Sequence, residues 1–139
     1  MFKNILIPVD FEEEDAIGRA LDFVGKMADD AAVVRFLHVV YSTPSIVSQF
    51  LPQDFEQKAS VESMNKLKEI ARSSDLGKLT TDFVVSHGNV YREILQMAED
   101  EEVDLIVLCS HKPAVEDYIL GSNAARVVRH AKCTVVVLR

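Results

Sequence analysis

The chain has 139 residues, of which 48% are hydrophobic and 27% charged, a length that suits one globular domain over residues 1–139. Five Gly and four Pro exclude a collagen-like or low-complexity chain. The formal net charge of −7 argues against a general nucleic-acid-binding protein, which needs a basic surface, although such a charge also simply favours solubility.

Apolar runs are short throughout the sequence. None approaches the roughly 18 residues that span a bilayer, and the first, Ile5 to Ile7, is too short for the core of a signal peptide. Cys109 and Cys133 both lie in apolar runs, which favours small buried side chains over a disulfide framework. We therefore expect a cytoplasmic protein that inserts into no membrane.

Short apolar runs alternate with segments of helical spacing. In chain order the predicted elements are strand 5–9, a helix on Ile17, Leu21, Val24 and Ala28, strand 33–40, a helix on Val61, Met64, Leu67 and Ala71, strand 83–85, a helix on Val90, Ile94 and Met97 that stops near Glu99, strand 105–108, a helix on Ala124, Val127, Val128 and Ala131, and strand 134–138. The first, fourth and fifth strands lack a sustained polar face, which is typical of strands covered on both sides. The pattern predicts an open, mostly parallel α/β sheet with right-handed crossovers.

The least regular stretch runs from Tyr41 to Gln57 and contains Pro44 and Pro52. We expect a loop there, with a helix that starts after Pro52. A loop of this length is either functional or a surface segment anchored by its two aromatic residues, Phe50 and Phe55.

Ligands of open α/β sheets bind beyond the carboxyl ends of the strands. Three strand ends carry residues of interest. They are Pro8-Val9-Asp10, His38-Val39-Val40, and Cys109-Ser110-His111-Lys112, the last followed after eight residues by Gly121-Ser122-Asn123 at the start of the final helix.

A phosphate group needs a helix start with free N–H groups. The first helix is a poor candidate because acids follow Asp10 from Glu12 to Asp15, and no Walker A or G-x-G-x-x-G pattern is present. The last helix is better, since Gly121 permits close backbone approach and Ser122 and Asn123 offer caps and N–H groups. The alternative is an ordinary Gly-Ser helix start.

The distribution of charge favours the last helix. Residues 1–109 carry 10 basic and 20 acidic side chains, whereas residues 110–139 carry 5 basic and 2 acidic ones. The alternative explanation is that Arg126, Arg129 and Lys132 only complement the carboxyl end of a helix, although this does not account for Lys112.

Asp10 allows three interpretations: a cap of the following helix, a hydrogen-bond acceptor for ribose, or a ligand of a divalent metal. His111 could contact phosphate, while His38 is more typical of a satisfied core histidine. The four histidines show no metal-ligand spacing, and we identify neither a metal site nor a catalytic residue.

Together these residues resemble the universal stress protein family along the whole chain. The segments that carry the resemblance are Lys3 to Asp10, Leu37 to Val40, Gly88 with Val90 and Ile94, Asp104 to Leu108 with Ser110-His111, and, most specifically, Gly121 to Val137. Nucleotide-binding members carry G-x-x-G, nine residues and G-[ST]. Here Cys109 and Lys112 replace the two glycines, and the spacer has eight residues.

This departure resembles the small bacterial F-type subgroup, with Ser-His-Arg/Lys-Pro and Leu-Gly-Ser-Asn, whose members bind ATP. The resemblance implies a Rossmann-like, adenine nucleotide alpha hydrolase-like sheet in the order 3-2-1-4-5. It also implies that Val39 contacts the base and that the adenine and ribose lie against Pro8, Val9 and Asp10. The residues that it implies for the ribose and phosphates are Ser110, His111, Gly121, Ser122 and Asn123. The Lys112 side chain offers the phosphate a direct charge contact in place of the backbone contacts that the replaced glycines would allow.

The resemblance further implies a homodimer through the final strand, Thr134 to Leu138, an apolar edge that would otherwise favour aggregation. The expected function is that of an ATP-binding regulator in the stress response, with or without Mg²⁺ and with at most slow hydrolysis or autophosphorylation. One alternative is a dimeric interaction module that has lost nucleotide binding. A phosphorylated receiver domain is another, but strand three ends in Ser86-His87-Gly88, without an acceptor Asp.

Overall fold

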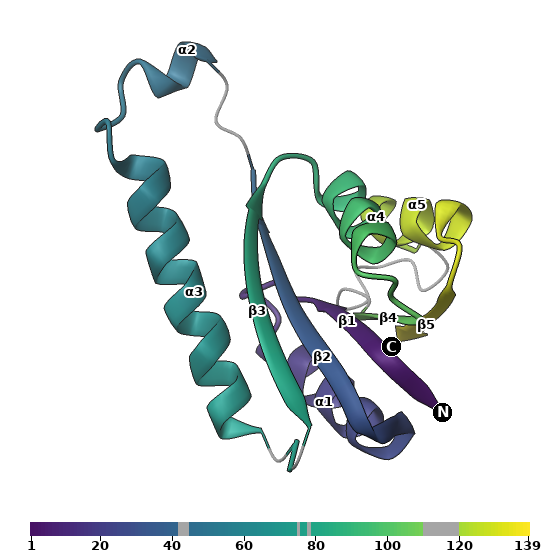
Figure 1. The fold of residues 1–139 in the computed structure, drawn as a ribbon. Coiled ribbons are helices and arrows are strands. Elements are labelled where there is room, and N and C mark those ends of the chain that lie inside the picture. Colours follow the sequence, from purple (N-terminus) through teal and green to yellow (C-terminus); the bar gives the residue numbers. More distant parts are fainter. Residues whose placement is uncertain (42–44, 75, 78, 110–119) are drawn as a thin grey trace.

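A parallel sheet forms the centre of the molecule (Figure 1). The computed structural model describes residues 1–41, 45–74, 76–77, 79–109 and 120–139, and within them five strands pair in the order β3-β2-β1-β4-β5. The strands are β1 (Phe2–Pro8), β2 (Ala28–Val40), β3 (Thr80–His87), β4 (Leu105–Cys109) and β5 (Thr134–Leu138). The predicted α/β fold and strand order are confirmed. The 2-1-3-4-5 order of receiver domains is not found.

The central strand, β1, and its neighbour β4 are buried on both faces. Ile5, Leu6 and Ile7 of β1 and Leu105, Ile106 and Val107 of β4 are each at most 1% exposed. Alternate side chains enter two different clusters, so that Ile5 and Leu105 pack on one side of the sheet and Leu6 and Ile106 on the other. The continuous apolar runs of these strands are a direct consequence of this position.

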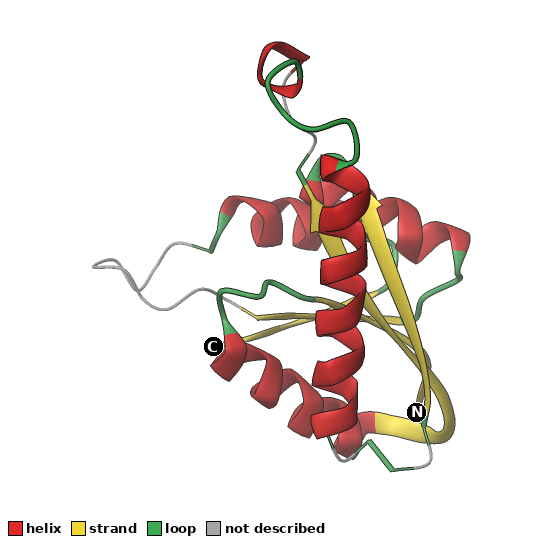
Figure 2. Ribbon diagram, turned by 90° about the vertical axis from the view of Figure 1, so that its left-hand side faces the viewer, coloured by secondary structure: helices red, strands yellow, loops and turns green. Residues whose placement is uncertain are grey.

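Two helices cover each face of the sheet. Helices α1 (Glu14–Met27) and α3 (Phe55–Ser73) supply Ile17, Val24 and Leu67 to the cluster around Ile5. Helices α4 (Val90–Asp100) and α5 (Ser122–His130) supply Ile94 and Val127 to the cluster around Leu6. Figure 2 shows the long helix α3 in front of the strands. This division follows from right-handed crossovers in a sheet whose strand order reverses at its centre.

Several predicted boundaries are wrong. Ala28, assigned to the first helix, instead begins β2, because this strand extends far enough to pair Ala28 with Phe2 of β1. β3 is longer than its apolar centre, since the backbone of Thr80 to His87 pairs with β2 regardless of side-chain polarity. β5 has the predicted bounds, and α4 ends at Asp100, beside the expected Glu99.

The predicted faces of two helices need correction. Val61 of α3 is 58% exposed, whereas the buried positions of this helix are Ser63 and Leu67. Val128 of α5 is 46% exposed beside the fully buried Val127. Neighbouring residues on a helix point about 100° apart, so only one of two adjacent valines can face the sheet.

A short helix that the sequence analysis did not predict, α2 (Ser45–Ser48), lies apart from the sheet beyond the end of β2 (Figures 1 and 2). Phe50 is 84% and Phe55 43% exposed, so these two aromatics do not anchor the segment as expected. The next helix, α3, begins after Pro52 as predicted. Residues 42–44 of this stretch lie outside the described part of the chain. In that part, no helix has the length and apolar character needed to cross a membrane.

We predict that Ile106→Ala lowers the free energy of unfolding by about 2–5 kcal/mol, because it opens a cavity at a position with no exposed surface. The measurement is urea denaturation followed by circular dichroism. Val128→Ala on the exposed side of α5 is the control and should change stability by less than about 0.5 kcal/mol. Equal effects of the two variants would contradict this placement of the core.

Candidate functional site

A cavity of about 580 Å³ opens at the carboxyl ends of β1, β2 and β4. The strand ends form its floor, and residues from the turn before α1 and from the starts of α1, α4 and α5 form its walls. The cavity lies where the strand order reverses between β1 and β4, because the chain leaves these strands towards opposite faces of the sheet. The fold therefore creates a crevice at this point.

The cavity gathers the predicted site residues that the structure describes. They come from the end of β1, the end of β2 and the start of α5: Pro8, Val9, Asp10, Val39, Gly121, Ser122 and Asn123. Ser110, His111 and Lys112 lie outside the described residues. The sequence analysis thus located three separate segments that meet in space.

The end of β1 is fixed by hydrogen bonds on both sides of Val9. Its N–H donates to the carbonyl of Leu37 at 2.8 Å, and its carbonyl accepts from Nδ1 of His38 at 2.8 Å. The His38 ring also packs on Phe11, with 4.1 Å between ring centroids. His38 is half-buried and lines the cavity, so its assignment to the core was wrong although its hydrogen bonding is satisfied. No sequence signal links His38 to Val9, since the contact depends on strand register.

Asp10 closes a turn ahead of α1 and does not cap the helix. Its Oδ1 accepts the N–H of Glu12 at 3.0 Å, and its carbonyl accepts the N–H of Glu13 at 3.1 Å. The residue that flanks the start of α1 is Glu13. The Asp10 side chain is exposed at the cavity, where its second oxygen can accept a further hydrogen bond.

The start of α5 forms the opposite wall. Gly121 has φ −51° and ψ 149°, a conformation open to most residues, and its carbonyl accepts the N–H of Ala125 at 2.8 Å. No side-chain hydrogen bond caps this helix within the described residues, so the expected caps from Ser122 and Asn123 are not observed. The first N–H groups of α5 have no partner inside the helix and can bind an anion.

The described wall of the cavity carries none of the basic side chains of the C-terminal segment, while Lys112 lies outside the described residues. The same described wall contains three carboxylates, Asp10, Glu12 and Glu13, and neither Lys nor Arg.

The basic residues of the C-terminal segment lie elsewhere. The Arg126 guanidinium lies 4.8 Å from the Tyr91 ring centroid, Lys132 pairs with Glu99 at 2.9 Å, and Arg129 belongs to the last turn of α5. These positions support the alternative explanation, in which the cations serve the end of the helix and its contacts with α4.

Cys109 ends β4 inside the cavity. Its thiol is half-buried and donates to the carbonyl of Ala16 at 3.0 Å. Burial raises the pKa of the Cys109 thiol, and the Glu13 carboxylate adds to this rise while Arg19 opposes it. The thiol therefore stays protonated and acts as a small apolar group with one weak hydrogen bond.

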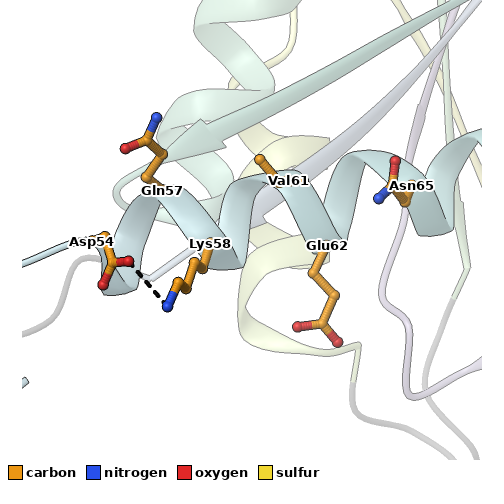
Figure 3. A pocket seen from close by; sticks show the side chains of 6 residues that line it. All are labelled: Asp54, Gln57, Lys58, Val61, Glu62 and Asn65. Carbon is orange, nitrogen blue, oxygen red and sulfur yellow. Dashed lines mark ion pairs between the residues drawn. The ribbon is translucent and has the colours of Figure 1, made fainter. Parts of the chain in front are cut away.

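A second hollow of about 430 Å³ runs along α3 (Figure 3). All its lining side chains are exposed and lie between Asp54, which flanks the start of this helix, and Asn65, with Lys58 paired to Asp54 at 3.0 Å. The groups do not converge on a common point, and the hollow does not form a site.

Comparison with known proteins gives the family. The model of the universal stress protein family matches residues 1–139. The chain belongs to this family. Universal stress protein G of Escherichia coli O157:H7 is 30% identical over 142 residues, covering 100% of both chains. Universal stress protein MJ0577 of Methanocaldococcus jannaschii is 31% identical, covering 100% of this chain and 96% of its own.

Solved structures of universal stress proteins share the fold. The structure of MJ0577 has a TM-score of 0.81 and 30% identity, covering 99% of this chain and 96% of that one. Two further structures, each 17% identical, are a universal stress protein in complex with cAMP (TM-score 0.65, 99% and 97% covered) and one from Archaeoglobus fulgidus in complex with dAMP (TM-score 0.67, 99% and 98% covered).

We predict that Cys109 of this universal stress protein reacts slowly with iodoacetamide and that its rate rises with pH around a midpoint above that of a free cysteine, because burial raises its pKa. The measurement is mass spectrometry on a Cys133→Ser variant, so that one thiol is followed. Urea-unfolded protein is the control and should show the ordinary midpoint. A pH midpoint for the native protein at or below that of the unfolded protein would contradict the raised pKa of the Cys109 thiol.

Proposed function

We propose that this universal stress protein binds an adenine nucleotide in the cavity between β1 and β4 and acts as a nucleotide-responsive homodimeric regulator in the cytoplasm, with residues 1–139 working as one domain. ATP is the nucleotide that the resemblance to the F-type subgroup implies. The observation that carries the proposal is the convergence of Pro8 to Asp10, Val39 and Gly121 to Asn123 on one cavity.

The chemistry of the walls suits a nucleoside. Leu37, Val39, Ile94 and Leu108 offer apolar contact to a base, and the exposed Asp10 carboxylate offers an acceptor for ribose hydroxyls. The uncapped start of α5 offers N–H groups to a phosphate. The volume of about 580 Å³ lies within the usual range for small-molecule sites.

The solved relatives add support of a general kind. The universal stress proteins that carry cAMP and dAMP hold ligands composed of adenine, a ribose-type sugar and one phosphate. We propose the same ligand class here. Because the sequence lacks a Walker A pattern, the proposal includes at most slow hydrolysis or autophosphorylation.

We predict that Gly121→Val weakens adenine-nucleotide binding at least about tenfold, since it places a branched side chain where backbone would approach the ligand. The fold should persist because valine can adopt the conformation of Gly121. The measurement is calorimetric titration, together with chromatography of any nucleotide released on denaturing the purified protein. Gly25→Val is the matched control, since a Cβ at Gly25 of α1 meets nothing within 4 Å.

The same titration tests the alternative function. A wild-type chain that binds no adenine nucleotide more tightly than millimolar, and that behaves like Gly121→Val, is a dimeric interaction module without a nucleotide. The replacement of two family glycines by Cys109 and Lys112 favours that outcome.

Dimerisation is proposed through β5, which lies at one edge of the sheet. Val135 to Leu138 are half-buried, each packing on a core cluster, and among the described strands none pairs with the outer edge of β5. Antiparallel pairing with a second copy would satisfy the free backbone groups and cover this apolar edge.

We predict that the wild-type chain has about twice its monomer mass of 15.5 kDa in light scattering, and that Val136→Lys shifts it to a monomer because the cation opposes edge pairing. Thr81→Lys on β3, the opposite edge strand, is the matched control and should remain dimeric. Circular dichroism checks that both variants fold. A monomeric wild type at high concentration would contradict the proposal.

A further inference from the structure

Two arginines from different helices meet at one tyrosine, outside the cavity. Helices α4 and α5 lie side by side (Figure 1). The guanidinium carbon of Arg126 on α5 lies 4.8 Å from the centroid of the Tyr91 ring on α4, and that of Arg92 lies 5.8 Å from the same centroid. Nε of Arg92 also donates to the Tyr91 hydroxyl at 3.1 Å. None of the three residues lines the cavity, so they form a cluster of their own, the Tyr91 cluster.

The Tyr91 cluster brings two positive charges to one neutral group. Arg92 and Arg126 are exposed, and Tyr91 is half-buried. The hydrogen bond from Arg92 lowers the pKa of the Tyr91 hydroxyl against the opposing effect of burial, and the charges of Arg92 and Arg126 lower it further. Both cations therefore act on the same oxygen. Two like charges held at one acceptor repel each other, and an anion between them lowers their energy.

The acidic residues of these two helices are engaged elsewhere. Helix α5 contains none. In α4 the Glu93 carboxylate lies against Gly88. Glu99 pairs at 2.9 Å with the lysine that follows α5, and Asp100 accepts at 2.9 Å from a glutamine of its own helix. Within the described residues, neither guanidinium of the Tyr91 cluster forms an ion pair.

The place of Arg92 in its helix also favours an anion. Arg92 is the third residue of α4, in the first turn, where the helix dipole disfavours a cation. Arg126 is the fifth residue of α5, one turn past its start. An anion bound between the two side chains would offset the unfavourable position of Arg92, because it would meet the positive ends of both helices as well as the guanidinium groups.

We propose that the Tyr91 cluster is an anion site, separate from the cavity, that takes a phosphate group in its dianionic form. Each guanidinium supplies a planar fork of N–H donors that matches phosphate oxygens, and the Tyr91 hydroxyl supplies one O–H donor. Inorganic phosphate and the phosphate of a nucleotide share this chemistry. Because no residue of the cluster lines the cavity, inorganic phosphate is the expected ligand, and it binds alongside a nucleotide.

The direct experiment is equilibrium dialysis of the full chain with radiolabelled inorganic phosphate at about pH 7.5, where the dianion predominates. Arg92→Gln and Arg126→Gln should each weaken binding at least about fivefold, since each removes a charge-assisted partner. Arg72→Gln is the matched control, because Arg72 is an exposed arginine in the last turn of α3 and should leave binding unchanged. Gly121→Val, which alters the cavity, should also leave it unchanged. Circular dichroism checks that the variants fold.

The Tyr91 side chain gives a second readout. The chain has three tyrosines and no tryptophan, so Tyr41→Phe with Tyr118→Phe leaves Tyr91 as the source of the phenolate absorbance. Bound phosphate should raise the pKa of Tyr91, because it opposes the phenolate charge and occupies the two arginines that lower this pKa. KCl at equal ionic strength is the control and should give a smaller rise by screening alone.

AMP separates the two sources of phosphate. We expect saturation with AMP to leave phosphate dialysis unchanged, and Arg126→Gln to leave AMP affinity unchanged. Competition between AMP and phosphate, with weaker AMP binding by Arg126→Gln, would overturn a separate site. The inference also fails if wild type and the double variant of Arg92 and Arg126 bind phosphate equally, or if neither binds it, whatever the result for nucleotides. A chain that binds phosphate at the cluster but no adenine nucleotide would refute the proposed function alone.

Discussion

The parallel pairing of β1 with β4 is the contact on which the rest of the molecule depends. Ile5 pairs with Leu105 and Leu6 with Ile106, and all four side chains are fully buried. At the amino end of this pair the Asp104 carboxylate accepts the backbone N–H groups of Lys3 and Asn4 at 2.9 and 3.1 Å. These contacts fix the register, and at the carboxyl end the chain has to diverge towards α1 on one face and α5 on the other. The cavity is the result of that divergence.

The sequence was sufficient for the order of elements because burial on both faces leaves a strong signal. The runs 5–7 and 105–108 have no polar face and form the buried strands β1 and β4, although the equally apolar run 134–138 forms an edge of the sheet. The signal is weaker where one face is exposed. In α3, Val61 fits the chosen helical spacing but is exposed, whereas Ser63 is buried although its residue type does not suggest it. Helix α2 was missed because four residues carry too little periodicity to detect.

Part of the candidate site could also be predicted from the sequence, and the sheet again provides the reason. Residues at the ends of β1 and β2 and at the start of α5 could be located because parallel strands bring their carboxyl ends to one edge of the sheet. The contact of His38 with Val9 could not, since it requires the register between β1 and β2 and the direction of a side chain. The positions of charged side chains could not be predicted from the sequence either. The basic excess of residues 110–139 is real in the sequence, but Arg126 and Lys132 are engaged with Tyr91 and Glu99 of α4.

The two helix starts at the cavity have opposite electrostatic character, and this gives the proposed ligand a direction. Both present N–H groups, but at α1 the carboxylates of Glu12 and Glu13 counter them, whereas α5 contains no acid. A nucleotide held across the crevice lowers its energy by placing its phosphate towards Ser122 and Asn123 and away from α1. Asp10 lies on the acidic side of the cavity, where the neutral hydroxyl groups of a ribose meet no electrostatic repulsion. On the proposed function, the acidic residues just before α1 therefore orient the ligand.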